Sequence, residues 1–294
     1  MGAPEIDLFF PDLAQRGVEY NARASVPDFD ACVADYARLS GIAKAACGGV
    51  YGLKYGPAQA EALDFFPACG LLRPSPVFVF IHGGYWRSQS KDDAALMAQV
   101  FTDAGVAVAV LEYTLLPVAT LAEVVRQMRS AVAWLYHNAA HYGIDPARIF
   151  AGGSSAGAHL VGMLLADGWH DEFGLPPDVL AGAMAISGLY DLRPLCEIAP
   201  NEWLRLVPEQ AARLSPLFLI PDHAPPLVMS VGGLETQGFR NQSRAYAQAW
   251  QKKGHALHWV DAPDRNHFNL LCDLAQPDLP LTQAVLALIA KTGG

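Results

Sequence analysis

Residues 148–165 read RIFAGGSSAGAHLVGMLL, a short apolar run, a glycine-rich turn and a second apolar run. The first run has the length of a buried strand, and residues 159–165 are typical of a helix. The turn fits the pattern G-x-S-x-G, in which a sharp strand-to-helix bend lifts a serine hydroxyl above a sheet. Gly153 and Gly157 keep the backbone around Ser155 free of side-chain bulk. The stretch predicts a parallel α/β sheet with Ser155 as a nucleophile.

Two other interpretations of this turn remain open. Ser154 is an alternative nucleophile, but no glycine follows it by two residues. The turn is also compatible with simple packing of a helix against a strand, in which case Ser155 caps the helix. A second motif elsewhere in the chain decides between these interpretations.

That second motif, His82-Gly83-Gly84-Tyr85-Trp86, follows the apolar run 77–81. Acyl transfer needs preorganised N–H donors for the developing oxyanion, and a glycine loop after an earlier strand supplies them in many enzymes. We expect Gly83, Gly84 and Ala156 to provide these donors. The alternatives are a plain turn between strand and helix for the glycines and core packing for Tyr85 and Trp86.

A proton acceptor for Ser155 is expected among the nine histidines, because the imidazole pKa suits that task. His267 lies on a turn after the last predicted strand, which makes it the best candidate for the base. The orienting acid is expected between the serine and the histidine, at the end of a strand. Glu235 fits this position, and Asp191 is the second candidate. Glu235 is alternatively a carboxylate at a helix N-terminus.

The remaining chain predicts repeated strand and helix units. We expect strands at 77–81, 106–111, 148–151, 183–187, 227–231 and 257–260, and helices at 121–141, 239–253 and 281–291. This order predicts a single α/β domain over residues 1–294, with a mostly parallel central sheet flanked by helices. The less regular segments 1–60 and 190–226 are expected to form a small cover over the catalytic residues.

Composition limits the partners. The chain has 294 residues, 52% of them hydrophobic, and a net charge of −9 without any Lys/Arg run. These values argue against nucleic acid and favour a small-molecule substrate. Five cysteines without a C-x-x-C pair predict a reducing, cytoplasmic location and no metal site, and we expect no cofactor. No apolar run is long enough for a membrane span, and a homodimer is left open.

The motifs together resemble the serine-dependent arylformamidase (kynurenine formamidase) branch of the α/β-hydrolases. The resemblance covers most of the chain, and HGGYW is its most specific part. It rests on Tyr20-Asn21, Val26-Pro27-Asp28, Leu63-Asp64, His82 to Trp86, Ser90-Lys91-Asp92, Ser155 to Leu160, Ser187 to Leu192, Gln242-Ser243 and His267-Phe268. Three positions depart from the family pattern. Ser154 stands where the family commonly has histidine, Asn266 where it has aspartate, and Glu235 where the acid is usually aspartate.

The resemblance implies an α/β-hydrolase fold and hydrolysis of N-formyl-L-kynurenine, an aryl formamide of tryptophan breakdown. It implies that Ser155, Glu235 and His267 are catalytic, and that Tyr85 and Trp86 contact the substrate. Carboxylesterase, other amidase or carbamate hydrolase activity on small aryl substrates would use the same catalytic residues. A ligand-binding homologue without catalysis is the remaining alternative, although no catalytic residue type is missing.

Overall fold

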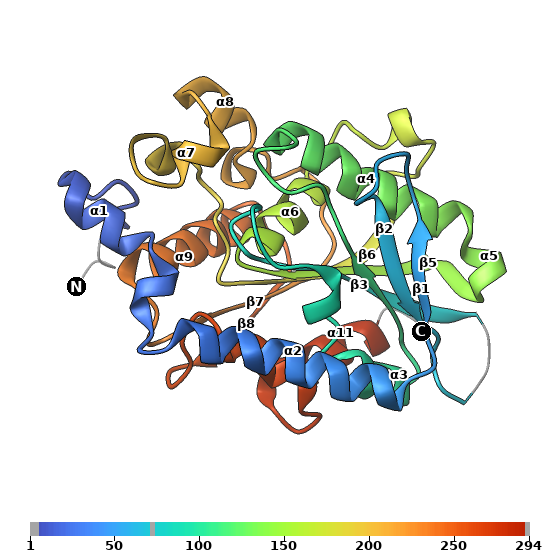
Figure 1. Cartoon of the computed structure of the whole chain (residues 1–294). Coiled ribbons are helices and arrows are strands. Elements are labelled where there is room, and N and C mark those ends of the chain that lie inside the picture. Colours follow the sequence, from blue (N-terminus) through green and yellow to red (C-terminus); the bar gives the residue numbers. More distant parts are fainter. Residues whose placement is uncertain (1–5, 71–73, 292–294) are drawn as a thin grey trace.

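The computed structural model describes residues 6–70 and 74–291, which form one eight-stranded sheet with helices on both faces (Figure 1). The strand order is β1-β2-β4-β3-β5-β6-β7-β8. β2 is antiparallel to β1 and β4, and every later pairing is parallel. The strands are β1 (Val50–Lys54), β2 (Ala62–Phe66), β3 (Ser75–Ile81), β4 (Ala107–Leu111), β5 (Ile144–Ser154), β6 (Leu180–Ile186), β7 (Leu227–Gly232) and β8 (Leu257–Ala262).

The helices form two layers. In Figure 1, α4, α6 and α9 lie on one side of the sheet, and α2, α3 and α11 lie on the other. The α-helices are α1 (Leu13–Glu19), α2 (Phe29–Ala46), α3 (Ala98–Asp103), α4 (Leu121–His137), α5 (Ala139–Tyr142), α6 (Ala156–Leu164), α7 (Asn201–Leu204), α8 (Pro208–Arg213), α9 (Gln237–Lys252), α10 (Asn269–Cys272) and α11 (Pro280–Lys291). None of the described helices is both long and apolar enough to span a membrane.

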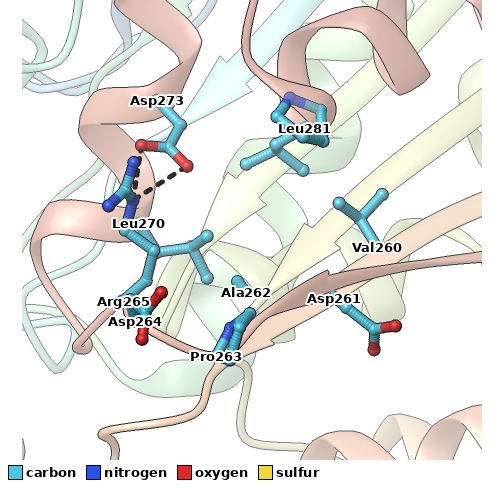
Figure 2. Close-up of a pocket in the computed structure, with 10 residues that line it drawn as sticks. Val260, Asp261, Ala262, Pro263, Asp264, Arg265, Leu270, Asp273 and Leu281 are labelled. Atoms are coloured by element: carbon cyan, nitrogen blue, oxygen red, sulfur yellow. Dashed lines mark hydrogen bonds and ion pairs between the residues drawn. The ribbon is translucent and has the colours of Figure 1, made fainter.

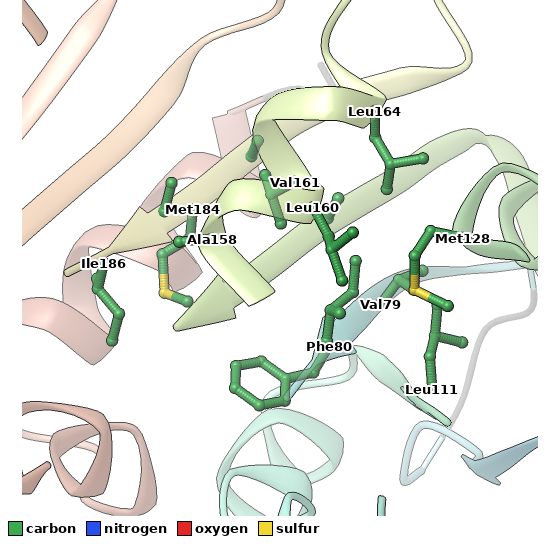
Figure 3. Packing of buried hydrophobic residues seen from close by; sticks show 14 of the residues in the cluster. Val79, Phe80, Leu111, Met128, Ala158, Leu160, Val161, Leu164, Met184 and Ile186 are labelled. Atoms are coloured by element: carbon green, nitrogen blue, oxygen red, sulfur yellow. The ribbon is translucent and has the colours of Figure 1, made fainter. Parts of the chain in front are cut away.

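The central strands are buried on both faces. Every residue of β3 is buried, because helices cover the side chains that point to either side of the sheet. Figure 3 shows Val79 of β3 on the side of Leu160 of α6, and Phe80 pointing to the opposite face of the sheet. Burial of such side chains on both faces accounts for the continuous apolar run in the sequence at 77–81.

The predicted fold class is confirmed, with corrections at the ends of elements and at one edge of the sheet. All six predicted strands are present, although β5 is longer than expected and β6 ends before Ser187. The helix predicted at 121–141 ends at His137, and a separate turn, α5, follows. The two strands β1 and β2 were not predicted. β2 carries Asp64, a buried charge that Lys91 compensates at 3.0 Å, so its sequence lacks the pattern of an apolar strand.

The two segments expected to form a cover contain short helices. Segment 1–60 contributes α1, α2 and a 3₁₀ turn at Ala22–Ser25, as well as β1, and residues 1–5 lie outside the described residues. Segment 190–226 contributes α7, α8 and two further 3₁₀ turns, Arg193–Glu197 and Pro216–Phe218. Their role as a cover stays a prediction.

Candidate active site

Ser155 sits in a strained turn between β5 and α6. Its φ of 57° and ψ of −120° are rare for a residue with a side chain and cost about 1–3 kcal/mol. The surrounding structure enforces this conformation, since the Ser155 N–H donates to the Ile186 carbonyl at 3.0 Å. A Cβ atom on Gly157 would lie 2.0 Å from the Ile81 carbonyl oxygen, so only glycine permits this close packing of helix and strand.

Ser155, His267 and Glu235 form a continuous hydrogen-bonded chain. The Ser155 Oγ lies 3.0 Å from Nε2 of His267, and Nδ1 of His267 lies 2.6 Å from Oε2 of Glu235. Because the carboxylate only accepts, Nδ1 carries the proton and Nε2 is left to accept from the serine hydroxyl. The expected serine, Ser155 rather than Ser154, therefore faces the expected histidine. This geometry is suited to proton removal from Ser155.

Two further donors hold the Glu235 carboxylate. The Ser187 hydroxyl donates to Oε1 at 2.6 Å, and the Gly232 N–H donates to the same oxygen at 2.7 Å. The side chain of Glu235 is fully buried, so these bonds replace water as the source of its solvation. The Gly232 contact shows how the longer glutamate fits, since its side chain folds back toward the end of β7. The contact with Ser187 could not be predicted from the amino-acid sequence.

The alternative acid, Asp191, is engaged elsewhere. Its carboxylate accepts from the Arg193 guanidinium at 2.7 and 3.0 Å and from the Arg193 N–H at 3.0 Å. Its side chain is fully buried against this partner, and the His267 Nδ1 position is occupied by Glu235. The structure therefore argues against Asp191 as the orienting acid, because its charge is compensated by Arg193.

The loop that carries His267 is fixed at both of its sides. The Gly233 N–H donates to the Ala262 carbonyl at 2.8 Å and the Leu234 N–H donates to the Arg265 carbonyl at 3.0 Å, which joins this loop to the Glu235 loop. Figure 2 shows the ion pair of Arg265, which belongs to this loop, with Asp273, and its Nε lies 2.8 Å from Oδ1. These contacts explain how the His267 and Glu235 side chains keep their positions relative to each other.

The glycine loop after β3 lies close to Ser155. A Cβ atom on Gly83 would lie 3.3 Å from the Ser155 Cβ, so glycine permits a close approach. The Gly83 carbonyl accepts from the Tyr113 hydroxyl at 3.0 Å and contacts Nδ1 of His82 at 3.0 Å. Because a peptide unit is planar and trans, fixing this carbonyl points the Gly84 N–H in the opposite direction. The loop is thus held in one orientation, and the donor role of Gly83, Gly84 and Ala156 stays a prediction.

A charged group supports the glycine loop. Nε2 of His82 donates to the Glu112 carboxylate at 3.0 Å, and the His82 ring stacks on Tyr113 with centroids 4.2 Å apart. The backbone N–H groups of Lys91 and Tyr113 also donate to Glu112. Burial opposes ionisation of Glu112, but the hydrogen bonds from His82 and these amides outweigh it and lower the pKa of Glu112. The sequence did not predict this support.

Aromatic rings extend from His267 to the glycine loop. The Phe239 ring lies 4.4 Å from the His267 ring, and Tyr85 lies 6.4 Å from Phe239 and 5.9 Å from Trp203, measured between centroids. The Tyr85 hydroxyl donates to the Tyr20 carbonyl at 2.6 Å, and Nε1 of Trp203 donates to the Tyr85 carbonyl at 3.0 Å. Both segments expected to form the cover therefore contact Tyr85.

Trp86 lies deeper than Tyr85. It is fully buried, and its ring meets His159 of α6 edge to face with centroids 5.0 Å apart. Nε2 of His159 donates to the Leu214 carbonyl at 2.8 Å, and burial lowers the pKa of this imidazole to about 4. Trp86 thus packs in the core beside the helix that follows Ser155, and its contact with substrate stays a prediction.

Comparisons with known proteins agree with this geometry. The family model BD-FAE matches residues 63–173. Kynurenine formamidase of Salmo salar is 31% identical over 244 residues, covering 81% of this chain and 81% of the relative. Kynurenine formamidase of Danio rerio is 29% identical over 243 residues, with the same coverage of both chains. A crystal structure from Silicibacter sp. TM1040, provisionally described as a thioesterase, has a TM-score of 0.79 at 29% identity and covers 93% of this chain and 98% of its own.

The curated relatives match along most of both chains, and the solved structure shares the arrangement of strands and helices. The predicted resemblance is confirmed. The chain belongs to the kynurenine formamidase family of α/β-hydrolase enzymes.

Proposed function

We propose that this enzyme hydrolyses the formamide bond of N-formyl-L-kynurenine to give kynurenine and formate. The observation that carries the proposal is the hydrogen-bonded chain of Ser155, His267 and Glu235 in a member of the kynurenine formamidase family. Ser155 is the nucleophile, His267 the general base, and Glu235 the acid that orients the imidazole. The N–H groups of Gly83, Gly84 and Ala156 form the oxyanion hole.

The first half of the reaction forms an acyl-enzyme. The Ser155 oxygen attacks the formyl carbon while Nε2 of His267 takes the hydroxyl proton, and the carbonyl electron pair moves to the oxygen. The oxyanion hole stabilises the resulting negative charge, and losing one donor of such a hole typically costs about 10²- to 10³-fold in rate. The N-terminus of α6, beside Ser155, favours the same charge.

The second half releases both products. His267 returns its proton to the arylamine nitrogen as the carbon–nitrogen bond breaks, which leaves a formyl ester on Ser155. Water, deprotonated by His267, then attacks this ester. His267 returns the proton to the Ser155 oxygen as the ester bond breaks, and formate leaves. An arylamine departs more readily than an alkylamine and the formyl carbon is unhindered, so an esterase-like site is sufficient for this amide.

The aromatic rings beside His267 support an aryl substrate. Phe239 contacts the His267 ring, and Tyr85 and Trp203 continue the same aromatic group. Because aromatic pairs favour stacked and edge-to-face contacts, these rings are suited to hold an aryl leaving group near the proton donor. We propose Tyr85 as a substrate contact on this basis, with Trp86 behind it.

The test compares N-formyl-L-kynurenine with p-nitrophenyl acetate as substrates of the wild-type enzyme and of Ser155→Ala. We expect both substrates to be hydrolysed by the wild type and neither by the variant, and a fluorophosphonate probe to label the folded wild type at Ser155. Brisk ester hydrolysis without formamide hydrolysis contradicts the proposed substrate. No labelling and no turnover of either substrate favours a non-catalytic ligand-binding protein.

Ester or thioester hydrolysis is the second candidate function. It is favoured by the similarity to the Silicibacter structure, which is provisionally described as a thioesterase. The same nucleophile and base serve both reactions, so the aryl formamide and ester rates of the test above decide between them.

Location, domain organisation and assembly also stay proposals. All five cysteines are free thiols in the structure, which is compatible with a reducing, cytoplasmic location. The segments that contact Tyr85 support a cover built from the chain's own N-terminal part and from residues 190–226, within one domain. Gel filtration with light scattering tests the homodimer.

A further inference from the structure

Ser187 donates the shortest hydrogen bond to the oxygen of Glu235 that faces away from His267. Its Oγ lies 2.6 Å from Oε1 of Glu235, and the residue is fully buried. Since an ionised carboxylate has no hydrogen to give, the Ser187 hydroxyl must be the donor. Oε1 is thereby bound by Ser187 and the Gly232 N–H, and Oε2 is left for His267.

The backbone fixes Ser187 in this position. It follows β6 directly and has a φ of 55°, a left-handed conformation that a residue with a side chain rarely adopts. Its N–H donates to the Ser230 carbonyl of β7 at 3.0 Å, and the carbonyl of the preceding residue, Ile186, accepts the Ser155 N–H at 3.0 Å. Ser187 therefore lies between the strand that leads to Glu235 and the turn that carries Ser155.

The hydroxyl acts on a carboxylate with few other partners. The side chain of Glu235 is fully buried, and its hydrogen bonds come from Ser187, Gly232 and His267. The Glu235 charge also interacts with two tyrosine hydroxyls, those of Tyr36 in α2 and Tyr190 after β6. Burial raises the pKa of both phenols well above their usual range, so both stay neutral near pH 7. His267 is thus the titratable side chain in direct contact with the Glu235 carboxylate.

We propose that Ser187 is a positioning residue of the catalytic machinery, which holds the Glu235 carboxylate in register and limits the charge that it directs at His267. The proposal rests on the proposed function. Two fixed donors on Oε1 prevent rotation of the carboxylate, so that Oε2 always meets Nδ1 of His267. The same two donors share the negative charge of the carboxylate.

Removing the Ser187 hydroxyl has two effects, and both shift the pH profile of kcat/KM in the same direction. With one donor fewer, more of the Glu235 charge falls on His267, which favours the protonated imidazole that cannot accept from Ser155. The carboxylate itself is also protonated more readily. Activity requires neutral His267 and ionised Glu235. The acid limb of kcat/KM therefore moves to higher pH, by about half a unit to one unit for one charge-assisted hydrogen bond.

The experiment uses Ser187→Ala and Ser187→Gly with p-nitrophenyl acetate and N-formyl-L-kynurenine. We expect kcat to fall about ten- to a hundredfold in both variants while KM changes little, since Ser187 is fully buried and its hydroxyl is bonded to Glu235. The glycine variant separates the hydroxyl from the backbone, because glycine adopts a φ of 55° without strain. Equal losses in both variants assign the effect to the hydroxyl.

Ser230→Ala is the matched control. Ser230 is equally buried on the neighbouring strand β7, and its hydroxyl donates to the Val260 carbonyl at 2.7 Å instead of to Glu235. We expect this variant to lose thermal stability like Ser187→Ala but to keep its acid limb unchanged. A limb that moves in both variants, or in neither, overturns the proposal.

A double-substitution cycle tests whether Ser187 acts through Glu235. Ser187→Ala is expected to lower kcat in the wild-type background and to have little further effect in the Glu235→Ala background. Full additivity contradicts the proposal. If Ser155→Ala and Glu235→Ala both keep wild-type turnover, the proposed function has failed. If both lose turnover while Ser187→Ala keeps it, only the role of Ser187 has failed.

Discussion

Replacing Glu235 by glutamine tests the orientation of the catalytic histidine most sharply. The two side chains have nearly the same size, so the change alters the hydrogen-bond pattern and leaves the packing intact. Oε1 of Glu235 accepts from the Ser187 hydroxyl and the Gly232 N–H, and the backbone N–H can only donate. The glutamine carbonyl is expected to take this position, because an NH₂ group there would leave the Gly232 N–H unsatisfied, at a cost of about 1–3 kcal/mol.

This orientation directs the glutamine NH₂ at Nδ1 of His267, which lies 2.6 Å from Oε2 in the wild type. The imidazole must then accept at Nδ1 and carry its proton on Nε2, where it can no longer accept the Ser155 proton. The same carboxamide substitution in a Ser-His-Asp triad lowers kcat about 10⁴-fold. That factor corresponds to about 5.4 kcal/mol of transition-state stabilisation. We expect a loss of this size for Glu235→Gln.

The assay is steady-state hydrolysis of p-nitrophenyl acetate and N-formyl-L-kynurenine at neutral pH. Thermal unfolding confirms that the variant is folded. Asp191→Asn is the comparison, because Asp191 pairs with Arg193 and is expected to affect stability more than kcat. Near-normal turnover of Glu235→Gln together with a loss of several orders of magnitude in Asp191→Asn would refute the assignment of the acid.

The remaining predictions concern stability and the glycine loop. Burial lowers the pKa of His159 to about 4, below the value of about 6.5 in an unfolded chain. The unfolded chain therefore binds a proton more readily, so the free energy of unfolding is highest above about pH 6.5 and falls as the pH drops toward about 4. The loss from this one group is up to about 3 kcal/mol. Urea unfolding at pH 7 and 4.5 is expected to show a flatter pH dependence for His159→Gln, and an unchanged slope contradicts this reasoning. Tyr113→Phe removes the bond to the Gly83 carbonyl and is expected to lower kcat about tenfold at similar KM, whereas an unchanged kcat in the kinetic assay argues against its orienting role. Gly84 has a φ of 90°, and a Cβ there would lie 2.1 Å from the Ser88 carbonyl oxygen. Gly84→Ala is therefore expected to lower the free energy of unfolding by about 1–3 kcal/mol and to abolish turnover. A variant with the melting temperature of the wild type would contradict this expectation.

The sequence was sufficient for those features that depend on local pattern. The apolar run before His82 predicts β3, since strands buried on both faces are continuously apolar. The glycines around Ser155 predict the turn, because only residues without a side chain tolerate the close approach of Gly157 to the Ile81 carbonyl. The positions of Glu235 and His267 followed from the order of strand ends along a parallel sheet, and the structure brings both side chains into one hydrogen-bonded chain with Ser155.

Features that depend on distant partners could not be predicted. β2 carries Asp64, whose burial depends on Lys91, which lies 27 residues away. The contact between Ser187 and Glu235 spans 48 residues, and neither residue type predicts the other. Tyr113 supports the glycine loop only because β4 pairs with β3. Asp191 illustrates the converse, since its partner Arg193 is near in sequence, but only the fold shows that Glu235 and not Asp191 contacts His267.

The most direct test of the proposed reaction is the rate of formate release from N-formyl-L-kynurenine by the wild-type enzyme and by Ser155→Ala, measured side by side on folded protein. We predict formate and kynurenine in equal amounts from the wild type and a rate at least about a thousandfold lower from the variant. Equal rates for the two proteins, or no formate from a wild type that still hydrolyses p-nitrophenyl acetate, would contradict the assignment of Ser155-dependent formamide hydrolysis.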